Sequence, residues 1–157
     1  MSEVAIFGAG CFWGVEEKFR QLHGVIETEV GYCGGDLPDT DYKEVCTGTT
    51  NHAEVVKITF DSSLIKYEEL LDVFWNSHNP TLLNRQGPDI GTQYRSVIFY
   101  TQEDQIEKAK NSMAKFDANG PFENPVVTQI VEVKNYVRGE EYHQKYLLKR
   151  GQTTCGL

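Results

Sequence analysis

The sequence predicts a two-layer α/β (α+β) sandwich, in which helices pack on a mixed sheet with a ferredoxin-like core. Short apolar runs with strand character alternate with segments of helical periodicity, in the order strand, helix, strand, strand, helix, strand, helix, strand. No repeat, linker or low-complexity stretch divides the 157 residues, and that length is typical of one domain. We therefore expect a single domain over residues 1–157, with residues 149–157 as a mobile C-terminal tail.

The first third of the chain contains two predicted strands, a helix and a loop. Residues 4–7 are apolar and precede two glycines, a pattern typical of a buried strand that ends in a tight turn. Residues 13–22 repeat apolar side chains at helical spacing, which predicts one buried face. Residues 25–31 alternate enough to form a second strand. Residues 32–50 are rich in Gly, Asp and Thr, so we expect a long, functional loop.

The rest of the chain continues the alternation. Strand segments are rich in β-branched and aromatic residues, whereas the loop is marked by Pro and Gly. In chain order, the predicted segments are a strand at 54–60, a helix at 64–77, a loop at 78–93, a strand at 95–100, a polar helix capped by Thr101 and running to about residue 116, a strand at 126–133 and a short helix at 140–148.

Composition excludes several classes of partner. The formal net charge is −8 and the pI is about 5.0, with no basic stripe, which argues against nucleic-acid binding. The sequence shows neither a secretory signal at its start nor an apolar stretch long enough to span a bilayer, so we expect no membrane partner. The expected location is the cytoplasm, and a monomer is the default assembly.

The four cysteines are Cys11, Cys33, Cys46 and Cys155. They are too few and too scattered for a disulfide scaffold, and they contain no C-x-x-C pair of the kind that binds structural zinc. In a reducing compartment, a cysteine in a suggestive setting is better interpreted as catalytic or redox active. No metal or organic cofactor is expected.

Cys11 has the most suggestive local sequence. It lies between a predicted strand and a predicted helix, where unpaired backbone N–H groups and the helix dipole favour the nucleophilic thiolate. Flanking Gly10 and Gly14 would let a substrate approach closely. Placement alone leaves a second interpretation equally open, since most cysteines without a disulfide are small buried apolar residues.

Two other kinds of site fit the sequence poorly. Gly8 and Gly10 resemble the start of a dinucleotide-binding G-x-G-x-x-G turn, but the third glycine comes one residue late and bulky side chains lie where the pyrophosphate would approach. His52, His78 and His143 do not have the spacing of a metal site.

The motif Gly10-Cys-Phe-Trp-Gly14 resembles the signature of the peptide methionine sulfoxide reductase A family. Further blocks resemble the family in the same order and together cover nearly the whole chain. These blocks are residues 31–35 (GYCGG), 42–48 (YKEVCTG), 52–56 (HAEVV), 84–87 (NRQG), 89–96 (DIGTQYRS) and 142–144 (YHQ). One departure lies before Tyr42, where the family often has Asn-Pro-Thr and this chain has Asp39-Thr-Asp41.

The resemblance implies a catalytic domain that reduces methionine S-sulfoxide, free or in proteins, to methionine. Cys11 would attack the sulfoxide sulfur. Glu54 would be a protonated acid that donates to the sulfoxide oxygen, and the phenols of Tyr42 and Tyr94 would donate two more hydrogen bonds. A carboxyl at its reference pKa of about 4.3 is ionised at neutral pH, so the proposed acid needs hydrophobic surroundings.

The resemblance also implies a binding pocket and a recycling step. Phe12 and Trp13 would hold the substrate's methyl group, and Asp89 would belong to the polar network of the site. Without the resemblance, the aromatic pair would be assigned to the core and the acid and phenols to ordinary surface or rim positions.

After methionine leaves, Cys11 would remain as a sulfenic acid, which condenses readily with a second thiol. We favour Cys155, because a mobile tail meets disulfide geometry more easily than a fixed loop. Cys33 and Cys46 are the competitors. Thioredoxin would then reduce the disulfide. A thiol peroxidase and a redox-sensing interaction domain remain as alternatives, but neither explains an acid and two phenols beside an aromatic pocket.

Overall fold

The computed structural model describes residues 2–151. Within these residues, six strands form one sheet in the order β7, β6, β1, β3, β2, β8, and only the β6–β7 pair is parallel. The strands are β1 (Ser2–Ala9), β2 (Val25–Cys33), β3 (Ala53–Asp61), β6 (Ser96–Tyr100), β7 (Gln129–Glu132) and β8 (Val137–Arg138), and the small hairpin is β4 (Arg85–Gln86) with β5 (Asp89–Ile90). The helices are α1 (Phe12–Arg20), α2 (Tyr42–Cys46), α3 (Tyr67–Asn76), α4 (Asp104–Asn119) and α5 (Tyr146–Lys149), with 3-10 turns η1 (Thr92–Tyr94) and η2 (Glu141–His143).

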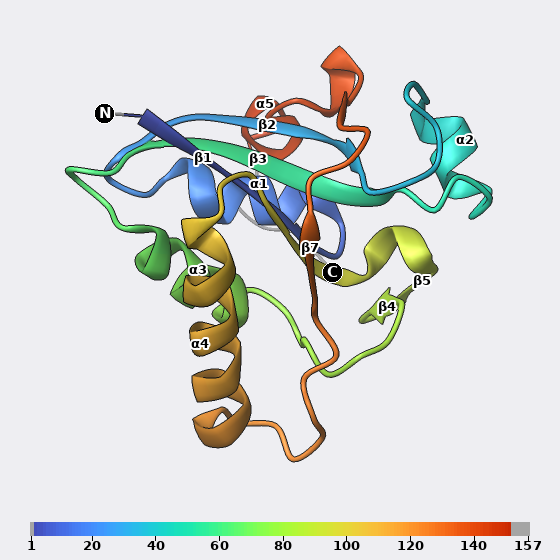
Figure 1. The fold of residues 1–157 in the computed structure, drawn as a ribbon. Coiled ribbons are helices and arrows are strands. Elements are labelled where there is room, and N and C mark those ends of the chain that lie inside the picture. The colour runs from blue at the N-terminus through green and yellow to red at the C-terminus, as the bar shows by residue number, and fades with distance from the viewer. Residues whose placement is uncertain (1, 152–157) are drawn as a thin grey trace.

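The predicted ferredoxin-like core is confirmed. Strands β1, β2, β3 and β6, with α1 after β1 and α3 after β3, follow the strand–helix–strand order twice. The four strands lie in the order β6, β1, β3, β2, and each neighbouring pair is antiparallel. In Figure 1, α1 and α3 lie against the same face of this sheet, and α4 packs beside α3.

The main core fills the space between that face and the helices. Phe7 from β1 lies at its centre, with its ring 5.6 Å from the ring of Phe19 in α1 and 5.0 Å from that of Phe74 in α3. All three side chains have no exposed surface. The sequence periodicity predicted these buried faces because apolar residues three and four positions apart share one side of a helix.

The opposite face of the sheet is covered by the chain itself. Residues 133–136 cross this face and connect β7 at one edge with β8 at the other. A smaller core of strand residues, which includes Cys33 and Phe99, packs there against Val133 and Tyr136. The Tyr136 hydroxyl donates a 2.6 Å hydrogen bond to Glu29 on β2.

Several local predictions need correction. Residues 32–50 contain helix α2, because the Asp41 side chain accepts a hydrogen bond from the Glu44 N–H at 2.8 Å and caps the helix. The expected loop at 78–93 contains the β4–β5 hairpin and begins η1. Thr101 does not cap α4, since its hydroxyl donates instead to the Val4 carbonyl at 2.9 Å.

The C-terminal part also differs from expectation. The helix expected at 140–148 is split into η2 and α5, because Lys145 has a left-handed backbone with φ of 50°. Strand β8 was not predicted from its two residues. The tail expected at 149–157 is described only as far as Gly151, so Cys155 lies outside the described residues.

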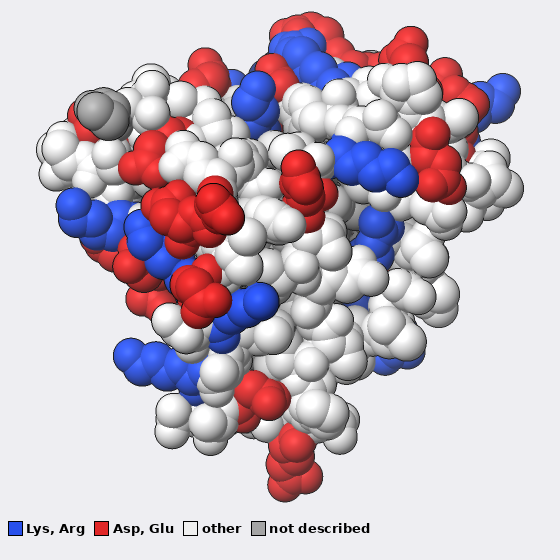
Figure 2. All heavy atoms as spheres, in the orientation of Figure 1, with Lys and Arg blue, Asp and Glu red and all other residues white. Residues whose placement is uncertain are grey.

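The described surface carries charges of both signs. Figure 2 shows acidic and basic side chains interspersed over this face, without a broad basic area. Within residues 2–151, no helix has the length and apolar character needed to cross a membrane.

Candidate active site

Cys11 occupies the junction between β1 and α1. Gly10 takes a positive φ of 96°, a conformation that a residue with a side chain rarely adopts, and it turns the chain sharply out of β1. Cys11 is then the N-cap residue of α1, with φ −56° and ψ 120°, and it is partly exposed. The thiol therefore lies at the end of a nine-residue helix where backbone N–H groups favour negative charge.

Glu54 lies next to this junction because β1 and β3 are antiparallel neighbours. The end of β1 meets the start of β3, and the Phe12 N–H donates to Glu54 Oε1 at 3.3 Å. The Glu54 side chain is 2% exposed. Burial raises the pKa of Glu54 to about 8, and the negative charge of Asp89 adds to this, whereas hydrogen bonds from the Phe12 N–H and Gln93 oppose it. At neutral pH this carboxyl holds a proton.

Two phenols complete the polar side of the site. Tyr42 is the first residue of α2 and Tyr94 is the last of η1, and both are partly exposed. Burial raises the pKa of each phenol, and the Glu54 carboxyl makes a smaller contribution in the same direction to both. Both remain proton donors at neutral pH.

The two aromatic residues after Cys11 have different environments. The ring of Phe12 is 1% exposed and packs 5.7 Å from Tyr32 and 5.1 Å from His143. Trp13 keeps some exposed surface, and its indole stacks on Tyr146 with ring centres 3.9 Å apart. Trp13 is therefore the one of the two with surface left to offer a ligand.

Asp89 and Gln93 are two further polar residues near Glu54. Asp89 belongs to the β4–β5 hairpin and influences the titration of both Glu54 and Tyr94. Gln93 is buried, interacts with Glu54 and donates to Cys46 Sγ at 3.4 Å. The sequence did not point to Gln93, although it lies within a block that resembled the family.

The other cysteines have separate positions. Cys46 is exposed at the end of α2, and it is among the neighbours that raise the pKa of both site phenols. Cys33 is fully buried in the smaller core on the opposite face of the sheet, where its thiol donates to the Lys134 carbonyl at 3.3 Å. Burial raises the pKa of the Cys33 thiol. Of the two predicted competitors of Cys155, only Cys46 therefore lies beside the site.

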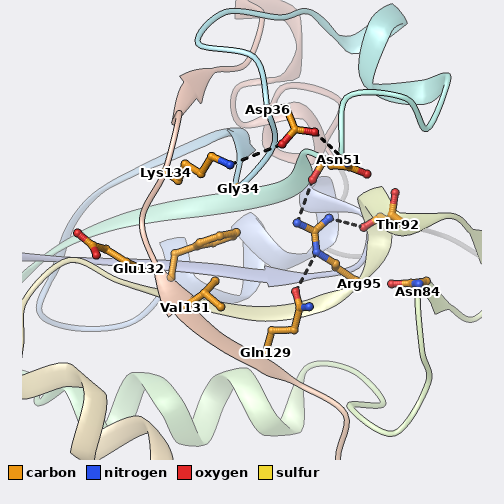
Figure 3. A pocket seen from close by; sticks show the side chains of 11 residues that line it. Gly34, Asp36, Asn51, Asn84, Thr92, Arg95, Gln129, Val131, Glu132 and Lys134 are labelled. Atoms are coloured by element: carbon orange, nitrogen blue, oxygen red, sulfur yellow. Dashed lines mark hydrogen bonds and ion pairs between the residues drawn. The ribbon is translucent and has the colours of Figure 1, made fainter.

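Behind the site, Arg95 joins three segments of the chain (Figure 3). Its guanidinium donates to the Thr92 carbonyl at 2.8 Å, to the Asn51 carbonyl at 3.0 Å and to the Gln129 side chain at 3.2 Å. These bonds fix the chain shortly before Glu54 and the turn that carries Tyr94. Arg95 also lines a cavity of about 490 Å³ that none of the predicted site residues enters.

The C-terminal segment supplies residues that the sequence did not assign a role. Glu140 accepts a 2.7 Å hydrogen bond from the Tyr32 hydroxyl and a 2.9 Å hydrogen bond from the Tyr42 N–H. His143 is 1% exposed and accepts from Trp13 Nε1 at 2.9 Å through Nδ1. Only the position of His143 in a matching sequence block could have indicated that it lies here. Among residues 2–151, no group of His, Cys, Asp and Glu side chains could hold a metal ion.

Comparison with known proteins decides the family. The family described as peptide methionine sulfoxide reductase matches residues 3–157. The chain belongs to this family. The MsrA reductase of Methanoculleus marisnigri is 54% identical over 153 residues, covering 98% of this chain and 93% of that protein. The MsrA reductase of Pelagibacter ubique is 56% identical over 148 residues, covering 94% and 99%.

Solved structures agree with this assignment. The reductase matches the reduced form of Mxr1 from Saccharomyces cerevisiae with a TM-score of 0.89 and 35% identity, over 96% of this chain and 87% of that one. It matches methionine sulfoxide reductase A of Corynebacterium diphtheriae with a TM-score of 0.86 and 34% identity, over 99% and 78%. The resemblance seen in the sequence is thereby confirmed, as is the fold class.

Proposed function

We propose that this reductase converts the S epimer of methionine sulfoxide, free or in proteins, to methionine through attack of Cys11 on the sulfoxide sulfur. The observation that carries the proposal is the buried Glu54, whose pKa of about 8 keeps a proton available beside the N-terminus of α1. A sulfoxide oxygen leaves sulfur readily only when it is protonated, so a neutral acid lowers the barrier to attack.

Each partner has one task in this reaction. The thiolate of Cys11 forms a bond to sulfur while Glu54 gives its proton to the oxygen, and Tyr42 and Tyr94 donate hydrogen bonds to that oxygen as charge develops. The oxygen then transfers to Cys11 as a sulfenic acid and methionine departs. Trp13, supported by Phe12, holds the methyl group, and Asp89 belongs to the polar network of the site. With oxygen and methyl fixed, only one epimer presents its sulfur to the thiolate.

Recycling requires a second thiol. We assign it to Cys155, whose thiol condenses with the sulfenic acid to give a Cys11–Cys155 disulfide and water. Thioredoxin then reduces this disulfide by thiol exchange. Support comes from the yeast relative Mxr1, which has been solved in complex with Trx2. Cys46 is the alternative, because it lies beside the site. We further propose that the protein acts as a monomer in the cytoplasm, where thioredoxin keeps thiols reduced.

The test is to incubate the protein with separated S and R epimers and excess dithiol, and to measure methionine by chromatography. Cys11→Ser and Cys46→Ser variants are assayed in parallel. We expect methionine from the S epimer only, with no product from Cys11→Ser and full activity from Cys46→Ser. Absence of methionine from both epimers would overturn the proposal.

A further inference from the structure

One carboxylate outside the proposed catalytic set contacts the residue that carries a catalytic phenol. Glu140 directly precedes η2 and uses both of its oxygens, Oε1 for the Tyr32 hydroxyl and Oε2 for the Tyr42 N–H. Tyr32 is fully buried in β2, so one end of this bridge is fixed in the core. Burial by itself opposes charge on Glu140, but these two hydrogen bonds, together with its own backbone N–H and His143, lower the pKa below the ordinary value.

The other end of the bridge is an element that cannot hold itself in place. Helix α2 has only five residues, and a helix of that length is not stable alone. Asp41 caps it locally by accepting from the Glu44 N–H, whereas Glu140 binds the N–H of its first residue, Tyr42, from 98 positions away in the sequence. The ring of Tyr42 also packs on His143, with centres 4.6 Å apart.

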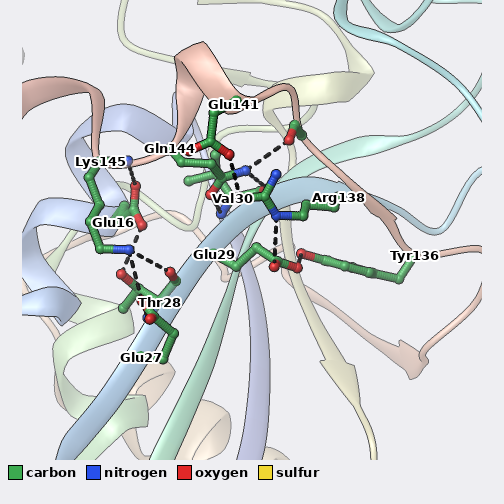
Figure 4. A network of polar contacts seen from close by, with 11 residues as sticks. Glu16, Glu27, Thr28, Glu29, Val30, Tyr136, Arg138, Glu141, Gln144 and Lys145 are labelled. Atoms are coloured by element: carbon green, nitrogen blue, oxygen red, sulfur yellow. Dashed lines mark hydrogen bonds and ion pairs between the residues drawn. The ribbon is translucent and has the colours of Figure 1, made fainter.

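The segment that carries Glu140 and His143 is itself anchored firmly (Figure 4). The buried side chain of Gln144 accepts from the Val30 N–H and donates to the Val30 and Gly139 carbonyls, each at 2.9 Å. One residue later, the Lys145 N–H donates at 2.7 Å to Glu16, a carboxylate of α1 that is 1% exposed. The segment is therefore tied to β2 and to the helix that begins after Cys11.

We propose that Glu140 is a positioning residue for sulfoxide reduction, which fixes the Tyr42 phenol relative to Glu54 by holding the start of α2 against the core. This inference rests on the proposed role of Tyr42 as a hydrogen-bond donor. Glu140 itself touches neither substrate nor Cys11 in this scheme. A simpler interpretation is that Glu140 only stabilises the fold, and the experiment must separate the two.

The experiment measures the rate of the first methionine formed by the reduced protein from saturating S-sulfoxide, without added reductant. We expect Glu140→Ala to slow this step about ten- to a hundredfold, because small misplacement of a catalytic group has effects of that size. Glu140→Gln should stay within about threefold of the parent, since its amide oxygen can accept from Tyr42 while its NH₂ group donates to the Tyr32 oxygen. Glu141→Ala is the matched control, because that neighbouring carboxylate is exposed and pairs with Arg138.

A double-mutant cycle with Tyr42→Phe identifies the route of the effect. If Glu140 acts through the phenol, Glu140→Ala should slow a Tyr42→Phe protein less than about threefold. Equal slowing in both backgrounds would overturn the inference and leave Glu140 with a structural role. If circular dichroism shows that Glu140→Ala is not folded, Tyr32→Phe takes its place in the same cycle. Tyr32→Phe removes the hydroxyl that anchors Glu140 to the core and leaves the bond between Glu140 and the Tyr42 N–H.

The inference and the proposed function can fail separately. A Tyr42→Phe protein that keeps the parent rate would refute the catalytic role of Tyr42, and the inference would fall with it. A slow Tyr42→Phe protein together with an unaffected Glu140→Ala protein would refute the inference alone.

Discussion

Replacement of Glu54 by Gln should make the protein more stable and less active at neutral pH. Glu54 has a pKa of about 8 in the folded protein against an ordinary value of 4.5. The folded state therefore binds this proton more tightly than the unfolded state, and stability falls as pH rises from 4.5 to 8. Relative to a carboxyl whose pKa does not change on folding, burial of Glu54 lowers the free energy of unfolding by about 3 kcal/mol at pH 7 and by about 5 kcal/mol above pH 8.

The variant removes this cost because Gln has nearly the same shape and does not ionise. Urea unfolding at pH 5, 7 and 9 should show a stability difference between variant and parent that grows over this range and is small at pH 5. A constant difference would mean that Glu54 is not buried as a neutral acid, and the reasoning would be refuted.

The same substitution tests the chemical role. At pH 7 a pKa of about 8 leaves Glu54 mostly protonated. Its protonated fraction is about 300 times that of a carboxyl at the ordinary pKa. Gln can donate a hydrogen bond but cannot transfer a proton, so the rate of the first turnover should fall about 10²- to 10⁴-fold. The parent rate should fall about tenfold for each pH unit well above 8 as the acid ionises. A Glu54→Gln protein within about threefold of the parent would exclude proton donation by this residue.

Three further substitutions have distinct expected outcomes. Cys155→Ser should give one methionine per protein but no turnover with thioredoxin. Turnover is measured as NADPH consumption with thioredoxin reductase, and continued turnover would transfer the resolving role to Cys46. Gln144→Ala should lower the free energy of unfolding by about 2–3 kcal/mol in urea titrations, because the Val30 N–H loses its partner in a buried position; a change under about 0.5 kcal/mol would show that water replaces the amide. Trp13→Phe loses the hydrogen bond to His143 and should raise KM several-fold with a smaller effect on kcat; an unchanged KM would remove Trp13 from the substrate pocket.

Regular elements of the fold followed from local patterns. The strands β1, β2, β3 and β6 and the helix α1 were predicted within a few residues, because one-sided burial imposes a period on the sequence. Short elements were not predicted, since α2 and β8 are stabilised by distant partners. The N–H of Tyr42 donates to Glu140, and β8 pairs with Gly31 and Tyr32. The local sequence contains no pattern that predicts such distant contacts.

The residues of the candidate site were also predicted on two different grounds. Placement of Cys11 between strand and helix came from the sequence itself, whereas Glu54, Tyr42 and Tyr94 came from resemblance. Physical reasoning could state that an acid here needs burial, but only the antiparallel pairing of β1 with β3 shows how that burial arises. Glu140 was missed because a carboxylate in a charged segment is usually a solvated surface residue.

The segment at residues 133–136, which crosses the sheet, links loss of activity to self-association. The strands on either side of it, β7 and β8, cover the outer edges of β6 and β2. If this part of the chain opened as one unit, two rows of unpaired backbone groups would be exposed together, and such rows are templates for aggregation. The same opening would withdraw Glu140 and His143 from the site. Loss of activity on mild heating should therefore coincide with the onset of self-association, well before the central strands unfold.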